Sequence, residues 1–293
     1  MGESRQGSVL VLGYFAAVHI GHRYLIERAK HISAEIGSSV TVVTFDDGIY
    51  AALGRDFREI YVLRERMSIL RELGVSVDVL PVDRAFLSQS PEQFLSVLSE
   101  KKPIAIVVGQ DYRFGKGAVG DAALLKSYFE KTGVEVEVCD LLSVGGKKIS
   151  STLIGELLAS GDIHAANAIL GSPFFISGTV VKGFENGKKL QFPTANLSFD
   201  MDKFIPRSGV YASYAYVDGV RYKSMTNIGS HPTFGYYEVN AETNIFDLSE
   251  DLYGRFLKVE LIDYLRPVLT FSDPASLSNQ LYLDKKKALE VLL

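Results

Sequence analysis

The chain has 293 residues, of which 47% are hydrophobic and 23% charged, and its formal net charge of -4 argues against nucleic acid as the main partner. Its single cysteine, Cys139, excludes an intramolecular disulfide and a cysteine-rich zinc site. The N-terminal residues lack the profile of a signal peptide, and no apolar run reaches the roughly 20 residues that span a bilayer, so we expect a cytoplasmic protein without a membrane partner.

Strand-like and helix-like segments alternate through the first half of the chain. Short β-branched runs predict strands at residues 9–12, 40–45, 75–80, 104–108 and 134–139. Apolar residues recur every three or four positions in 23–36, 63–73, 91–98 and 121–131, which predicts helices between the strands. This order predicts an α/β domain with a parallel sheet, in which ligands lie at the carboxyl ends of the strands.

The pattern changes after about residue 160. A helix is predicted at 163–170, and Gly171 marks the expected boundary between a domain of residues 1–171 and one of residues 172–293. Strands are predicted at 174–181, 210–217, 220–228, 243–248 and 256–264, with a hairpin turn at Asp218-Gly219. Closely spaced strands without helices predict a small antiparallel barrel, which a helix at 274–293 would close.

Two histidines follow the first predicted strand, at the start of a helix. His19 and His22 flank Gly21, which allows an anion to approach the backbone closely. A helix N-terminus offers unpaired N–H groups, and the imidazoles can donate hydrogen bonds to phosphate oxygens. By itself, a His-x-x-His pair is also compatible with a purely structural role.

Two later segments add to this pattern. Ser150, Ser151 and Thr152 stand directly before the apolar run 153–158, where hydroxyl groups form either an ordinary helix cap or a second phosphate cradle. The stretch from Gly109 to Gly115 leaves a buried strand as a glycine-rich loop.

Taken in order, these segments resemble the adenylyltransferase half of bacterial bifunctional riboflavin kinase/FAD synthetases. That family carries Gly-x-Phe-Asp-Gly-x-His-x-Gly-His, then Gly-x-Asp-Phe-x-Phe-Gly, then Ser-Ser-Thr-x-x-Arg. The resemblance implies a Rossmann-like nucleotidylyltransferase domain in which the phosphate of FMN attacks the α-phosphate of ATP and releases pyrophosphate. It also implies catalytic roles for His19 and His22, ATP or phosphate binding by Gly13, Phe15, Gly21, Ser151 and Thr152, and flavin binding by Asp111 and Phe114.

The first half of the chain departs from the family pattern at three places. Ala16-Ala17 replaces Asp-Gly, Gly155 replaces the arginine, and Asp47-Gly48-Ile49 stands where Pro-His-Pro is usual. The arginine would be a phosphate clamp, so its loss leaves open a weakened or lost adenylyltransferase activity.

The second half contains the most specific stretch, GTVVKGFENGKKLQFPTANL. Gly183, Lys188 and Lys189 suit a loop over the phosphates of ATP, and Pro193 fixes the backbone before Thr194 and Asn196. The neutral oxygens of Thr194 and Asn196 suit Mg²⁺, a hard cation bound beside substrate phosphates. Alternatively, this stretch is an Asn-Gly hairpin followed by a proline turn and has a purely structural role.

This stretch, with TNIGSHPTF and AETNIFDLSEDLYG, resembles the riboflavin kinase module of the same family. The resemblance implies that Thr194 and Asn196 bind Mg²⁺–ATP, that Glu242 takes the proton of the ribityl 5′-hydroxyl, and that Asn227 contacts flavin. Pro193, Gly183 and the two lysines would bind ATP.

The sequence thus predicts a bifunctional enzyme that makes FMN from riboflavin and FAD from FMN, with ATP as co-substrate and Mg²⁺ as cofactor. Small molecules are its expected partners, and we expect a monomer or weak oligomer. Three alternatives stay open: a kinase without adenylyltransferase activity, a non-catalytic flavin-binding regulator, and a cytidylyl- or pantetheine-type transferase. The last leaves the second half unexplained.

Overall fold

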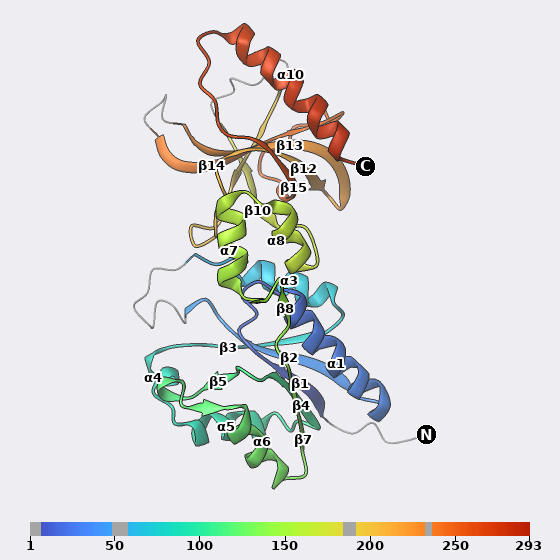
Figure 1. Ribbon diagram of the computed structural model, residues 1–293, viewed down its shortest axis with the longest axis vertical. Coiled ribbons are helices and arrows are strands. Elements are labelled where there is room, and N and C mark those ends of the chain that lie inside the picture. Colours follow the sequence, from blue (N-terminus) through green and yellow to red (C-terminus); the bar gives the residue numbers. More distant parts are fainter. Residues whose placement is uncertain (1–6, 49–57, 184–191, 232–235) are drawn as a thin grey trace. The chain divides into compact units, whose positions relative to one another are not determined.

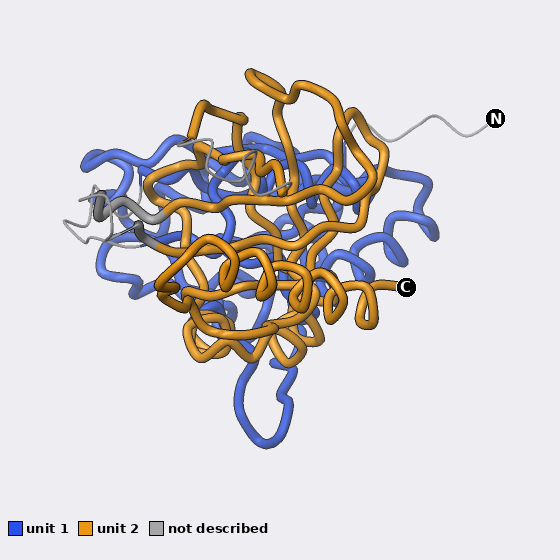
Figure 2. The backbone as a smooth tube through the Cα atoms, turned by 90° about the horizontal axis from the view of Figure 1, so that it is seen from above, with its two compact units in different colours: residues 1–151 blue, residues 152–293 orange. Residues whose placement is uncertain are grey.

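The structure, a computed structural model, describes residues 7–48, 58–183, 192–231 and 236–293. The chain divides into two compact units, residues 1–151 and residues 152–293, coloured separately in Figure 2. This division lies N-terminal to the boundary expected at Gly171.

Unit 1 is built around a five-stranded parallel sheet in the order β3-β2-β1-β4-β7 (Figure 1). Val11 in the central strand lies opposite Val42 on one side and Val107 on the other. Because all neighbours run parallel, the segments that follow β1, β2 and β4 leave the sheet at the same edge. The strands are β1 (Ser8–Leu12), β2 (Ser39–Phe45), β3 (Ser76–Leu80), β4 (Ala105–Gly109) and β7 (Glu135–Cys139).

Helices connect these strands and bury their apolar faces against the sheet. Phe94 and Phe129 are nearly fully buried in a core that also holds Leu10 and Ile106 of the central strands. The helices are α1 (Ile20–Ile36), α3 (Leu63–Glu72), α4 (Arg84–Leu87), α5 (Pro91–Glu100) and α6 (Ala122–Glu130), with a 3-10 turn η1 (Lys116–Ala118). The predicted parallel sheet with intervening helices is confirmed.

Two short antiparallel ladders, which the sequence did not predict, lie beyond the carboxyl edge of the sheet. One pairs β5 (Arg113–Phe114) with β6 (Gly120–Asp121), and the other pairs β8 (Ser143–Val144) with β9 (Lys147–Lys148). These ladders are too short for a periodic pattern, and the glycines around them indicate only loops.

Unit 2 is a closed antiparallel barrel with strand order β10-β11-β14-β13-β12-β15. Asp218 and Gly219 form the predicted two-residue turn with φ of 50° and 82°, the backbone that such hairpins require. The strands are β10 (Phe175–Val181), β11 (Ala195–Ser198), β12 (Gly209–Val217), β13 (Val220–His231), β14 (Tyr236–Ile245) and β15 (Phe256–Arg266).

In the described part of the chain, helices accompany the barrel: α7 (Ser151–Ser160), which begins at the last residue of unit 1, α8 (Ile163–Leu170) and α10 (Pro274–Val291). The last helix packs Ala288 against Met225 and Phe246 of the barrel, as expected for a closing helix. It is also tied to the barrel by Arg266 of β15, whose Nη2 lies 2.6 Å from Oδ2 of the fully buried Asp284.

One strand prediction in unit 2 was wrong in extent, and one strand was missed. The sequence predicted a strand at 243–248, but β14 runs over Tyr236–Ile245 and the chain then turns at Asp247, whose φ is 58°. Strand β11 was missed because its four residues follow Pro193 and lack an alternating apolar pattern.

Candidate functional site

The loop after β1 carries both histidines into the first turn of α1. His19 is the N-cap residue, and its Nδ1 accepts a hydrogen bond from the backbone N–H of His22 at 3.3 Å. This bond leaves the ring proton of a neutral His19 on Nε2, so Nε2 becomes a donor. The N–H groups of Ile20 and Gly21 belong to the same first turn, where helices leave donors without intrahelical acceptors.

Both imidazoles are held uncharged at neutral pH. Burial lowers the pKa of His19 from 6.5 to about 4, against smaller raising effects of a backbone hydrogen bond and of Asp111. Burial also lowers the pKa of His22 well below its ordinary value, and the neighbouring His19 adds to the effect. Two neutral rings can therefore donate hydrogen bonds at this site, but neither brings a positive charge.

Two glycines make room for aromatic rings in this loop. A Cβ atom on Gly13 would lie 2.9 Å from the Phe15 ring, and one on Gly21 would lie 3.1 Å from Nδ1 of His19. Phe15 is fully buried with φ of 59°, and its ring centroid lies 4.7 Å from that of His22. Gly21 thus has a packing role besides the predicted access for an anion.

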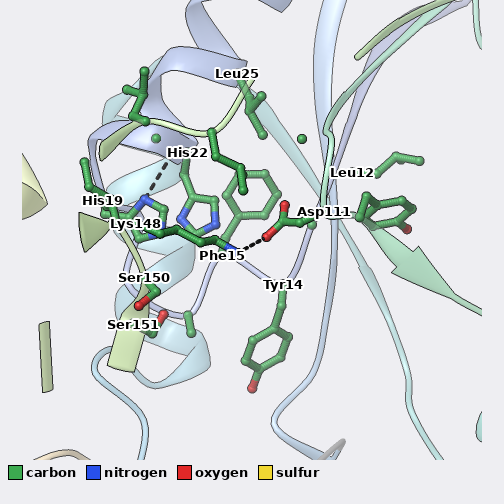
Figure 3. Close-up of a pocket in the computed structure, with 18 of the residues that line it drawn as sticks. Leu12, Tyr14, Phe15, His19, His22, Leu25, Asp111, Lys148, Ser150 and Ser151 are labelled. Carbon is green, nitrogen blue, oxygen red and sulfur yellow. Dashed lines mark hydrogen bonds and ion pairs between the residues drawn. The ribbon is translucent and has the colours of Figure 1, made fainter. Parts of the chain in front are cut away.

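A cavity of about 410 Å³ opens over these residues, and Figure 3 shows its lining. It lies at the carboxyl edge of the sheet, where parallel α/β sheets bind their ligands. Most of the residues predicted for the first site line this one cavity, although they come from three separate segments of sequence: Gly13, Phe15, His19, Gly21, His22, Asp111 and Ser151.

A lysine that the sequence analysis did not single out also lines the cavity. Nζ of Lys148 lies 2.5 Å from Oδ2 of Asp111, and Figure 3 shows the two side chains meeting. Both side chains are about half exposed, at 50% and 49%, so they remain accessible to a ligand. The only signal in the sequence was its place in Lys147-Lys148, just before the hydroxyl triplet.

Two predicted residues of the first site are not among those that line this cavity. Phe114 is only 5% exposed and belongs to the core, with its ring 5.3 Å from that of Phe94, while the neighbouring Tyr112 lines the cavity instead. Thr152 begins unit 2, so its predicted contact with phosphate stays a prediction.

In unit 2, three predicted residues stand side by side across the barrel wall. Glu242 of β14 pairs in register with Asn196 of β11 on one side and with Asn227 of β13 on the other. Residues directly opposite in a sheet project on the same face, with Cβ atoms roughly 4.5–5.5 Å apart. The tertiary structure therefore unites the carboxylate with two amides that lie 46 and 15 positions away in sequence.

The amide of Asn196 is held by a hydrogen bond on one side and lies close to Gly183 on the other. Its Oδ1 accepts a hydrogen bond from Nδ2 of Asn240 at 2.7 Å. A Cβ atom on Gly183 would lie 2.3 Å from its Nδ2, so a larger residue there would have to displace the amide or the chain. Gly183 is thus explained by close packing, whereas Lys188 and Lys189 lie outside the described residues.

Thr194 and Pro193 line a second cavity of about 400 Å³ at one end of the barrel. Nδ2 of Asn244 donates a hydrogen bond to the carbonyl of Pro193 at 2.7 Å, which anchors this segment to β14. Thr243, buried inside the barrel, also reaches the cavity, and the turn at 248–253 forms its rim.

Comparisons with known proteins identify the family of each half of the chain. A family model described as FAD synthetase matches residues 2–153, and one described as riboflavin kinase matches residues 170–292. The chain is similar to the bifunctional riboflavin kinase/FMN adenylyltransferase of Bacillus subtilis, with 34% identity over 98% of this chain and 93% of that protein. The chain belongs to the bifunctional riboflavin kinase/FMN adenylyltransferase family.

Two further matches cover nearly the whole chain. The Escherichia coli K12 protein of the same name is 32% identical over 98% of this chain and 93% of its own length. A crystal structure of a protein described as a macrolide-efflux protein from Streptococcus pneumoniae matches with a TM-score of 0.87 and 31% identity, over 97% of this chain and 94% of that one. Within the described residues, none of the helices combines the length and apolar character that a membrane span requires.

Family membership confirms the predicted two-domain architecture and an enzyme with both activities, riboflavin kinase and FMN adenylyltransferase. ATP, riboflavin, FMN and FAD are the substrates and products that the family implies. The two family models leave residues 154–169 between them, so the boundary at Gly171 stays a prediction.

Proposed function

We propose that the histidine cavity of unit 1 carries out adenylyl transfer from ATP to FMN despite the departures at Ala16, Ala17 and Gly155. A phosphate oxygen of FMN forms a bond to the α-phosphorus of ATP, the bond from that phosphorus to the bridging oxygen breaks, and pyrophosphate leaves. Nε2–H of His19 and the first-turn N–H groups of α1 would donate to the phosphate oxygens, on which negative charge is concentrated.

The position of Lys148 is the observation that best supports this proposal. The family arginine is absent, and the neutral histidines bring no charge, yet a cation lies in the same cavity within 2.5 Å of Asp111. On ATP binding, Lys148 would turn from Asp111 to the phosphates and supply the positive charge that Gly155 cannot. Ser151 would add a hydroxyl donor, and Tyr112 an aromatic face for a ring of either substrate.

For unit 2 we propose in-line transfer of the γ-phosphate of ATP to the 5′-hydroxyl of riboflavin. Glu242 would accept the hydroxyl proton, and its neighbours Asn196 and Asn227 would orient the reactants. Thr194 and Asn196 would hold Mg²⁺, which neutralises phosphate charge when bound. The donor set fits this ion, because an amide oxygen has two lone pairs and Asn240 uses one of them on Asn196.

Product analysis tests both halves separately. Purified protein is incubated with Mg²⁺, ATP and either riboflavin or FMN, and the flavins are separated by chromatography. FAD from FMN supports the proposal for unit 1, and FMN from riboflavin supports that for unit 2. Formation of FMN without FAD would instead support the alternative, a kinase that has lost its adenylyltransferase activity.

We propose that the enzyme acts in the cytoplasm, as a monomer or weak oligomer, on small molecules and without nucleic acid or membrane partners. The net charge of -4 supports the absence of a nucleic-acid partner. Light scattering during chromatography, with and without substrates, measures the oligomeric state.

A further inference from the structure

Arg66 is a fully buried cation next to the histidine cavity that the chemistry above does not use. It lies in α3, has no exposed surface and forms an ion pair with Asp47. Oδ2 of Asp47 also accepts the N–H of Leu63 at 2.8 Å, at the start of the same helix. A buried charge is costly to desolvate, so the ion pair and the hydrogen bonds of the two Nη atoms stabilise Arg66 in this position.

Two partners of Arg66 lie in the cavity wall. Nη1 donates to the carbonyl of Tyr14 at 2.8 Å, and Nη2 donates to the carbonyl of Phe45 at 3.1 Å. Tyr14 and Phe45 both line the cavity, and each follows or ends a neighbouring parallel strand. The ladder between β1 and β2 ends with Leu12 opposite Val43, so Arg66 joins the two segments where that ladder no longer does.

The carbonyl of Tyr14 controls the residue that follows. It belongs to the same planar peptide unit as the nitrogen of Phe15, so anchoring this carbonyl restricts the φ angle of Phe15. That angle is 59°, in the left-handed region that residues with a side chain rarely adopt. Thr44 donates a second hydrogen bond to this carbonyl at 2.7 Å.

Phe15 in turn packs against the pair of histidines. The Phe15 ring lies 4.7 Å from the ring of His22, which stacks on His19 at 3.7 Å (Figure 3). We propose that Arg66 is a positioning residue of the adenylyltransferase site, which fixes the peptide before Phe15 and thereby the place of the His22 ring. This inference rests on the proposed function of the histidine cavity.

The test compares Arg66→Met and Arg66→Lys with the unaltered protein. Methionine fills similar space without donors, whereas lysine keeps the charge beside Asp47 but cannot reach both carbonyls. Arg28→Met is the matched control, because Arg28 pairs with Glu137 at 2.6 Å in the same unit and does not line the cavity. Steady-state kinetics are measured for both reactions at a temperature where protease resistance shows unit 1 to be folded.

We expect Arg66→Met to lower kcat for FAD formation about tenfold or more, because small misplacements of catalytic groups are costly, with less change in the KM for ATP. Arg66→Lys should recover part of this loss. Riboflavin phosphorylation by unit 2 should stay within about twofold of the unaltered protein in the Arg66 variants. Both activities of Arg28→Met should also stay within about twofold of the unaltered protein. An unchanged kcat for FAD formation in folded Arg66→Met would overturn the inference, as would a loss in strict proportion to the unfolded fraction.

A second readout does not depend on activity. The chain has 5 histidines, so the imidazole nitrogen signals of His22 can be assigned by NMR of histidine-labelled protein. Arg66→Met and Arg66→Lys should shift these signals, and Arg28→Met should not. If the unaltered protein makes no FAD, the proposed function fails, whereas unshifted signals in both Arg66 variants refute the positioning role.

Discussion

The imidazole rings of His19 and His22 lie 3.7 Å apart with their planes inclined by only 10°, as a stacked pair. Burial lowers the pKa of both rings, so the pair is uncharged at neutral pH and avoids the repulsion between two imidazolium ions. The stack therefore links the charge state of the cavity to pH.

Unit 1 should lose stability as the pH falls below about 6.5. The unfolded chain takes up a proton on His19 near pH 6.5, but the folded state does so only near pH 4, so acid favours unfolding between these values. One proton contributes a slope of about 1.4 kcal/mol per pH unit. Urea unfolding of the unaltered protein and His19→Asn across this range measures the slope, and equal slopes would contradict the prediction.

Lys148→Met should weaken adenylyl transfer by about tenfold to a hundredfold, because a hydrogen bond to a charged group contributes about 1.5–3 kcal/mol. Kinetics of FAD formation at varied ATP concentration measure the effect. Lys147→Met is the matched control, since Lys147 is an exposed neighbour in the same strand that does not line the cavity. Equal effects of the two variants would show that only general charge matters.

Glu242→Gln should lower riboflavin phosphorylation by about 10²–10⁴-fold, the usual contribution of a general base. FAD formation from FMN should be unaffected, because Glu242 lies in the other unit. The variant Glu290→Gln removes an exposed carboxylate of α10 and should retain both activities. Substantial FMN formation by Glu242→Gln would exclude the carboxylate as the base.

Gly183→Ala should impair the kinase without affecting the adenylyltransferase. The added methyl would lie 2.3 Å from Nδ2 of Asn196, and either this amide or the chain at Gly183 must then move. We expect a rise in the Mg²⁺ concentration needed for half-maximal FMN formation, measured by magnesium titration. An unchanged magnesium titration would show that the amide of Asn196 does not take part in binding the metal ion.

Asp284→Ala should destabilise unit 2 by about 3–5 kcal/mol, because it leaves the charge of Arg266 nearly buried without its partner. Replacing both residues by methionine should cost much less. Thermal unfolding followed by calorimetry, compared across the two variants and the unaltered protein, measures the difference. A double variant as unstable as Asp284→Ala would show that packing, rather than the unpaired charge, dominates.

Local patterns were sufficient to predict most of the fold. The β-branched runs of the first half and the period of its helices reflect burial against a sheet, and both appear in the sequence. The short strand β11 and the two small ladders could not be predicted from the sequence, because a few residues held by distant partners carry no periodic signal. The end of β14 was also missed, since a turn at Asp247 depends on backbone geometry that apolar residues do not reveal.

The sequence by itself determined the histidine pair, the hydroxyl triplet, Pro193-Thr194-Ala195-Asn196 and the family resemblance, because these are local or ordered motifs. Only the tertiary structure decided that Lys148 meets Asp111 in the histidine cavity, that Glu242 stands between Asn196 and Asn227, and that Arg66 holds Tyr14. Such contacts depend on strand register and on helices packed across a sheet, which bring together residues too far apart in the chain for any local pattern to join them.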